Sequence, residues 1–206
     1  MQNKLDMKDH NAIFWHKIDV LCTLISQWYY TLIMRARCRV RHVNLGSNCK
    51  FYGKSLVQRA VNSTIFIGAD CQFRSKSTSN KIGINHPCMI TAYLPNSKVL
   101  IGNKCGFSGV TIRAAYSIVI GNNVRVGANS VIYDSDGHQD DKRTSGVKPI
   151  VIEDNVWIGY GVFVTKGVTI GKNSIIGAYS IVTKDIPANV IAAGNPCRVI
   201  KSLNIN

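Results

Sequence analysis

Residues 152–182 read IEDNVWIGYGVFVTKGVTIGKNSIIGAYSIV, and one spacing governs the whole stretch. Apolar residues recur six positions apart: Ile152, Ile158, Val164, Ile170, Ile176 and Val182. The position four residues after each of the first five is small or β-branched: Val156, Val162, Val168, Ser174 and Ser180. An α-helix repeats about every 3.6 residues and a strand about every two, so neither produces this period. A fixed short repeat indicates one small structural unit that is stacked many times.

The repeat predicts a triangular coil made of three hexapeptides, in which the apolar and the small residue both point inward. Glycine follows three of the apolar residues, and we expect it to permit a corner turn through a positive φ: Gly159, Gly171 and Gly177. Asparagine tolerates the left-handed conformation and recurs near the expected corners: Asn103, Asn122, Asn123, Asn129, Asn155 and Asn173. We therefore predict a parallel β-helix whose coils span 43–190 and are least regular over 74–98.

Three motifs carry a resemblance to a known family. They are NVWIG at 155–159, GVTIG at 167–171 and GNPCRVI at 194–200. The chain resembles the hexapeptide-repeat acyltransferases, and more narrowly the galactoside/maltose acetyltransferase-like branch of sugar O-acetyltransferases. The resemblance implies an all-β, left-handed coil and a homotrimer with a coenzyme A groove between subunits. It also implies transfer of an acetyl group from acetyl-CoA to a hydroxyl of a sugar or surface-glycan precursor, without a metal.

Residues 1–42 carry no hexapeptide signal and form a separate segment before the β-helix domain, 43–206. Within 12–34, apolar residues alternate at spacings of four and three, which predicts a helix: Phe14, Ile18, Leu21, Ile25, Trp28 and Leu32. A basic run follows: Arg35, Arg37, Arg39 and Arg41. Two interpretations stay open. The helix covers the open coil edge or a neighbouring subunit, or residues 12–41 rest on the inner face of a membrane.

Composition limits the partners. The 206 residues include 25 Lys+Arg against 11 Asp+Glu, a net charge of +14, which favours anionic partners such as coenzyme A or anionic lipid. Nucleic acid is not expected, because no basic stripe interleaved with aromatic residues is evident. Seven cysteines without a C-x-x-C pair are typical of reduced core cysteines. Because Met1–Asn11 is polar, we expect no signal peptide and a cytoplasmic protein.

The repeat breaks over 133–149, a polar stretch that must leave the coil as a loop. Loops on rigid scaffolds often carry function, and this one begins with Asp134-Ser-Asp136-Gly-His138. The resemblance implies that His138 is the catalytic base. An imidazole titrates near neutral pH, so it can take the proton of an attacking hydroxyl and return it to the leaving thiolate. We expect Asp136 to hold the second ring nitrogen, with Asp134 or a backbone carbonyl as alternatives.

The resemblance implies the remaining site residues. The backbone N–H of Tyr160 matches the oxyanion donor, and Ser108 is a candidate hydrogen-bonding partner of the acceptor. The positions that match the coenzyme A groove are Trp157, Tyr160, Ala178, Thr183, Lys184, Arg198 and Lys201. For Arg198 and Lys201 the alternative is a solvated terminal surface, and for Trp157 an aromatic side chain that packs at a subunit interface.

Other functions of the same fold remain alternatives. One is acetylation of an amino sugar, serine or a drug, and another is a non-catalytic scaffold. A zinc lyase on this coil needs three converging histidines, and only His138 and His86 fall within the coils.

Overall fold

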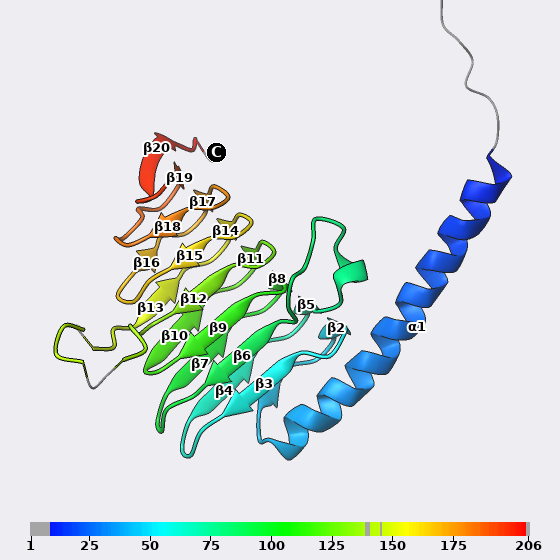
Figure 1. Ribbon diagram of the computed structural model, residues 1–206, viewed down its shortest axis with the longest axis horizontal. Helices are drawn as coiled ribbons and strands as arrows, with labels where there is room; N and C mark the ends of the chain where they lie inside the picture. The colour runs from blue at the N-terminus through cyan, green and yellow to red at the C-terminus, as the bar shows by residue number, and fades with distance from the viewer. Residues whose placement is uncertain (1–8, 139–140, 145, 205–206) are drawn as a thin grey trace, which may run out of the picture.

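The computed structural model describes residues 9–138, 141–144 and 146–204. Helix α1 (His10–Val40) comes first, and the strands that follow wind into a three-sided coil (Figure 1). Face A consists of β1 (Asn44–Leu45), β4 (Thr64–Ile67), β7 (Lys98–Ile101), β10 (Ser117–Ile120), β13 (Ile150–Ile152) and β16 (Thr169–Ile170). Face B consists of β2 (Lys50–Tyr52), β5 (Gln72–Arg74), β8 (Gly106–Ser108), β11 (Arg125–Val126), β14 (Trp157–Ile158), β17 (Ile175–Ile176), β19 (Val190–Ala193) and β20 (Arg198–Ser202). Face C consists of β3 (Leu56–Arg59), β6 (Met89–Ala92), β9 (Thr111–Ala114), β12 (Val131–Tyr133), β15 (Phe163–Val164) and β18 (Ile181–Val182).

Neighbouring strands on each face are parallel, except that β20 returns antiparallel to β19. The fold is the left-handed parallel β-helix that the repeat and the resemblance predict. The six apolar repeat positions from Ile152 to Val182 are all fully buried, and the small positions between them are at most 1% exposed. The parallel register places equivalent repeat positions above one another, as in the pairing of Ile120 with Ile152 and of Ile152 with Ile170.

The predicted reason for the repeat glycines is wrong. Gly159, Gly171 and Gly177 are absent from the positions with positive φ. A Cβ on Gly159 would instead lie 2.7 Å from the backbone nitrogen of Ala178, and one on Gly171 would lie 2.4 Å from that of Ala188. Glycine is required here because the backbone of the next coil crosses directly over it.

Several of the predicted corner asparagines adopt the left-handed backbone conformation. Asn123, Asn129, Asn155 and Asn173 have φ between 54° and 62°, as predicted. The amides of Asn123, Asn155 and Asn173 also form a ladder along the A–B edge, with Asn123 donating to Asn155 at 2.9 Å and Asn155 to Asn173 at 3.1 Å. Asn103 and Asn122 do not have positive φ; their side-chain oxygens accept backbone N–H groups of adjacent coils.

The irregular region is narrower than the predicted 74–98. Strands β6 and β7 fit the coil, and only 75–88 leaves it, with a short 3₁₀-helix at Ser77–Ser79. Asn129 holds this loop against the coil, because its side chain accepts from the amide of Asn85 and donates to the carbonyl of Gly83, both at 2.9 Å.

Only the C-terminal end of α1 covers the first coil. Met34 and Cys38 are buried and Tyr30 packs beside them, a spacing of four that places all three on one side of the helix. Thr31 accepts the backbone N–H of Phe51 at 3.0 Å. The end of the helix is thus part of the core that closes the prism.

Most of the apolar stripe noted in the sequence of α1 does not pack on the coil. Its residues Phe14, Leu21, Ile25, Trp28 and Leu32 are 57–67% exposed, because α1 meets the coil only near its end and then extends beyond it (Figure 1). The helix therefore covers the coil edge with residues at its C-terminal end, and this stripe stays exposed. Within the described part of the chain, no helix combines the length and apolarity that a bilayer span requires.

Three cysteines occupy small inward positions of successive coils. The thiols of Cys49, Cys71 and Cys105 donate to carbonyl oxygens of the next coil at 3.1–3.2 Å. The hydrogen bond with Cys105 raises the pKa of Cys71 to about 12, and burial raises the pKa of Cys38 to about 11. Cys71 and Cys38 therefore stay protonated near neutral pH, as expected of buried core cysteines.

The long loop leaves between β12 and β13, and its root is firmly held. The Asp134 carboxylate is fully buried and accepts the backbone N–H groups of Ala115, Tyr116 and Ser117 at 2.6–2.8 Å. Lys166 forms an ion pair with Asp136 and donates to the carbonyl of Gly146 at 3.1 Å. Both strands of the loop root are therefore fixed to the prism.

Replacing Met34 by alanine tests the helix cap. The variant should lose about 2–5 kcal/mol of unfolding free energy in chemical denaturation, since it leaves a cavity at the end of the core. Leu32→Ala, at a residue 57% exposed, should change stability by less than about 0.5 kcal/mol. Equal losses in the two variants would contradict the cap.

Asp134→Asn tests the loop root. The amide replaces a charged acceptor of three N–H groups, so we expect a loss of at least about 2 kcal/mol in the same measurement. Asp141→Asn removes a carboxylate that pairs with Arg143 at the loop surface, and should change stability much less than Asp134→Asn. A stability unchanged in Asp134→Asn would show that the buried carboxylate does not hold the root.

Candidate functional site

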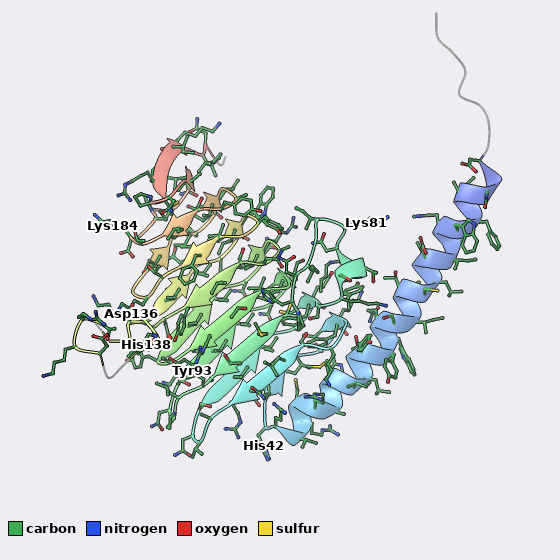
Figure 2. The ribbon with its side chains drawn as sticks, viewed as in Figure 1. His42, Lys81, Tyr93, Asp136, His138 and Lys184 are labelled. Atoms are coloured by element: carbon green, nitrogen blue, oxygen red, sulfur yellow. The ribbon has the colours of Figure 1, made fainter. Side chains whose placement is uncertain are left out.

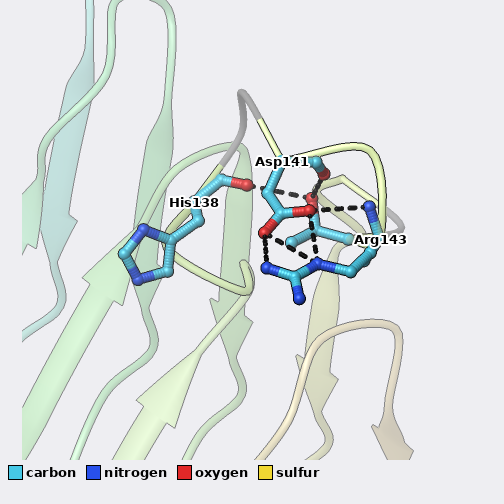
Figure 3. A network of polar contacts seen from close by, with 4 residues as sticks. His138, Asp141 and Arg143 are labelled. Atoms are coloured by element: carbon cyan, nitrogen blue, oxygen red, sulfur yellow. Dashed lines mark hydrogen bonds and ion pairs between the residues drawn. The ribbon is translucent and has the colours of Figure 1, made fainter.

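His138 lies just beyond the fixed root of the loop, at the edge between faces C and A. Its carbonyl oxygen accepts from the amide of Asp141 at 3.3 Å and from the hydroxyl of Thr144 at 2.9 Å. The side chain is exposed, and Figure 3 shows the ring directed away from the Asp141–Arg143 ion pair. The backbone is thus fixed while the imidazole stays accessible.

The two candidate carboxylates have different surroundings. All three N–H groups at the turn 115–117 bind Asp134, so this buried carboxylate holds the turn in place. Asp136 is 38% exposed and pairs with Lys166, which is 12% exposed. Figure 2 shows Asp136 and His138 at the same edge of the prism. The sequence prediction assigned Lys166 no role, yet it connects the loop to the next coil.

A cluster that the sequence analysis missed lies beside this loop. The hydroxyls of Tyr93 and Tyr133 are 3.1 Å apart, and the Arg113 guanidinium lies 4.0 Å from the Tyr93 ring centroid and 5.3 Å from that of Tyr133. A Cβ on Gly137 would lie 3.2 Å from the Tyr133 hydroxyl, so the cluster reaches the residue next to His138. Burial, followed by the hydrogen bond with Tyr133, raises the pKa of Tyr93. The three positions are twenty residues apart in sequence, a spacing close to one coil, and this was the available signal.

Tyr160 lies on a different edge, between faces B and C. Among the described residues, its backbone N–H has no protein acceptor. Its hydroxyl receives a hydrogen bond of 2.8 Å from Asn129, and its ring lies 5.3 Å from that of Tyr179. Ala178 is on the next coil at the same edge, above Gly159. The predicted oxyanion donor and pantetheine position are therefore neighbours.

Ser108 and Trp157 line a depression of about 370 Å³ on face B. Ser108 is 8% exposed, and its hydroxyl accepts from the side chain of Asn80 at 3.1 Å. Trp157 is 55% exposed on the outer surface, beside Arg125. The Ser108 hydroxyl is largely covered by the 75–88 loop, whereas Trp157 is open to a partner.

The remaining predicted residues lie toward the C-terminal end. Thr183 and Lys184 follow β18 and are exposed at the C–A edge. Figure 2 shows Lys184 on the same side of the prism as His138. Arg198 and Lys201 are exposed on β20. Arg198 donates to its neighbouring carbonyl at Cys197 at 2.9 Å.

One chain therefore does not assemble the whole predicted site. His138 and Asp136 lie at the C–A edge, whereas Tyr160 and Ala178 lie at the B–C edge. In a three-sided rod, two edges of one copy cannot face each other. A base and an oxyanion donor from these edges meet only if the edges belong to different copies.

A family model and a solved structure both match the coiled part of this chain. Residues 149–184 match the family model described as bacterial transferase hexapeptide (six repeats). AntD, an N-acyltransferase from Bacillus cereus solved in complex with dTDP and 3-hydroxybutyryl-CoA, has a TM-score of 0.62 at 16% sequence identity. The superposition covers 83% of this chain and 88% of that one, and at this identity it supports the fold alone.

Two relatives are more similar in sequence. The galactoside O-acetyltransferase of Escherichia coli (strain K12) is 51% identical over 100 residues, which is 46% of this chain and 49% of that protein. The galactoside O-acetyltransferase of Lactococcus lactis is 51% identical over 92 residues, 42% of this chain and 44% of that protein. The chain thus spans about half the length of the curated relatives it matches. Residues 149–184 thus match the hexapeptide repeat of the bacterial transferases, and about half of the chain is similar in sequence to galactoside O-acetyltransferases.

Proposed function

We propose that the protein transfers an acetyl group from acetyl-CoA to a hydroxyl of a sugar or surface-glycan precursor. The observation that carries this proposal is an exposed imidazole, His138, on a loop whose root is fixed to a hexapeptide-repeat coil. About 50% identity to galactoside O-acetyltransferases over roughly half the chain supports the same chemistry.

In the proposed reaction His138 acts as general base and then as general acid. Its imidazole takes the proton of the acceptor hydroxyl while the hydroxyl oxygen bonds to the thioester carbonyl carbon. The backbone N–H of Tyr160 donates to the carbonyl oxygen as negative charge develops there. When the carbon–sulfur bond breaks, the imidazolium returns the proton to the thiolate, so the products are an acetyl ester and free coenzyme A.

Asp136 is the proposed positioning residue for His138. A carboxylate that accepts the second ring N–H selects the tautomer whose free nitrogen can take a proton. Lys166 limits where this carboxylate can lie, because the ammonium group is nearly buried and also bound to the Gly146 carbonyl.

The proposal requires a homotrimer with the active site between subunits. His138 of one copy and Tyr160 of another can then meet, although they lie on different edges of one chain. In this arrangement Ser108 contacts the acceptor. Coenzyme A is held by Trp157, Tyr160, Ala178, Thr183, Lys184, Arg198 and Lys201. The net charge of +14 suits the coenzyme's phosphates.

We further propose that α1 contacts an anionic membrane surface. Exposed aromatic and aliphatic residues lie on the part of the helix beyond the coil, and arginines occupy its last turns. Aromatic side chains and a basic flank are the features by which helices bind the interface of anionic bilayers. Thr23 and Gln27 share a stripe with the packed Tyr30 and Met34, so the apolar residues beside them face away from the prism.

The first prediction concerns the base. Once a thiol-release screen over mono- and oligosaccharides has found an acceptor, His138→Ala should lower the rate about 10²–10⁴-fold, because proton transfer is lost. Acetyl-CoA binding, measured by calorimetry, should be unchanged. His16→Ala, an exposed histidine on α1, serves as the control. Full activity in His138→Ala would refute the assignment, and a wild-type protein that does not bind acetyl-CoA would favour a scaffold.

The second prediction concerns the helix. The full chain should co-sediment with phosphatidylglycerol vesicles and much less with phosphatidylcholine vesicles. Leu24→Glu should weaken binding about tenfold or more, since it places a charge on the exposed apolar surface. Thr23→Glu adds the same charge on the adjacent stripe and should weaken binding less. Equal effects, or a change of oligomeric state in Leu24→Glu alone, would contradict membrane contact.

A further inference from the structure

We infer that the outer surface of face C binds an anionic glycan segment, through carboxylate or phosphate groups, as the acceptor of the proposed transferase. This inference rests on the proposed function and specifies its substrate class. The surface carries a groove of about 610 Å³ whose lining includes Arg41, Arg59, Thr91, Tyr93 and Arg113. Strands β3, β6 and β9 form its floor and lie next to one another in face C.

The groove leads to the candidate base. Arg41 follows the end of α1, Arg59 ends β3, and Arg113 lies two coils further on, in register with Tyr133. Tyr133 contacts the position of Gly137, the neighbour of His138. Figure 2 shows Tyr93 and His138 on the same side of the prism. A glycan that lies along the arginines therefore ends where the imidazole is exposed.

Among the residues that the structure describes, the arginines of the groove have no acidic partner. Arg41 donates to the carbonyl of Val57 at 2.8 Å, and Arg59 donates to the carbonyls of Arg41 and Ser63 at 2.8 and 2.9 Å. Arg113 lies over tyrosine rings, and its guanidinium has no hydrogen bond to another described residue. Across the described residues, the only ion pairs are Arg143–Asp141 and Lys166–Asp136.

The nearby acids are already engaged. Asp134 is buried under three N–H groups, Asp136 pairs with Lys166, and Asp141 pairs with Arg143. The positive charge of the groove is thus not neutralised by the protein in the described part of the chain. An anion from outside would supply the missing partner.

The geometry favours sugar-linked anions that can accept two parallel hydrogen bonds from one guanidinium group. Backbone carbonyls hold Arg41 and Arg59, and two tyrosine rings hold Arg113, so the guanidinium groups are partly oriented before binding. A guanidinium donates two parallel hydrogen bonds to a carboxylate or phosphate. The tyrosine rings offer apolar surface with a polar tip, a combination that suits a sugar ring beside an acidic group.

Binding is tested without acetyl-CoA, using calorimetry on the full chain at low and at raised salt. The probes are tetragalacturonate, its neutral methyl ester and a glycerol phosphate tetramer, with a thymidine oligonucleotide as a polyanion that is not a glycan. The first and third probes separate carboxylate from phosphate as the recognised group. We expect an anionic glycan probe to bind at least tenfold more tightly than the methyl ester and the oligonucleotide.

Arg113→Gln should weaken that binding at least tenfold, and Arg113→Lys should retain an intermediate affinity because it keeps the charge without the planar donors. Lys172→Gln removes one exposed charge between β16 and β17, away from face C, and should bind like the wild type. Arg113→Gln should fold like the wild type, because Arg113 is exposed and donates no hydrogen bond to another described residue.

Equal affinity for tetragalacturonate, the glycerol phosphate tetramer and the methyl ester would overturn the inference. So would equal losses in Arg113→Gln and Lys172→Gln, or preferred binding of the oligonucleotide. Thiol release with neutral sugars, without binding of either anionic glycan probe, would leave the proposed function standing and remove only this inference. Anionic glycan binding that depends on Arg113, without thiol release for any acceptor, would remove the proposed function and leave a glycan-binding groove.

Discussion

The close contact between successive coils is the constraint on which the rest of the structure depends. Backbone hydrogen bonds of about 2.8 Å connect each coil to the next, as from Gly159 to the carbonyl of Ile176. At the edges the backbones approach so closely that a Cβ on a repeat glycine would overlap the coil above. Side chains therefore alternate strictly between a narrow interior and an outer surface, and function is confined to the faces, edges and excursions of the prism.

The two loops that leave the prism are held in position by side-chain contacts with the stacked coils. The carboxylate of Asp134 binds three amides of the preceding coil, and Lys166 joins the loop to a later coil. The 133–149 segment is thus attached on both sides of its departure point, and His138 follows directly. The 75–88 excursion is held in a comparable way by Asn129. Rigid coils with anchored excursions can position reactive groups without a globular core around them.

The sequence was sufficient to predict the coil, but not the contacts between coils, the packed side of α1 or the side-chain clusters on the surface. Six-residue spacing predicted the burial of Ile152 to Val182, because interior positions are set by the repeat alone. It could not explain Gly159, whose requirement comes from a neighbour nineteen residues away, Ala178. The packed side of α1 was also missed, since helical periodicity shows which residues share a stripe and not which stripe meets the prism. Arg113, Tyr93 and Tyr133 form a cluster only through the register of three coils.

The arginines of face C lie at different levels of the stack, and this placement has an evolutionary consequence. Each coil adds about 4.8 Å of height, and repeat proteins gain or lose whole units with little effect on the others. If face C binds the proposed glycan, insertion of one coil between Arg59 and Arg113 would lengthen the bound segment by about one sugar unit. The reactive loop would keep its own supports throughout. Specificity for chain length could thus diverge by duplication of a short segment, independently of the chemistry.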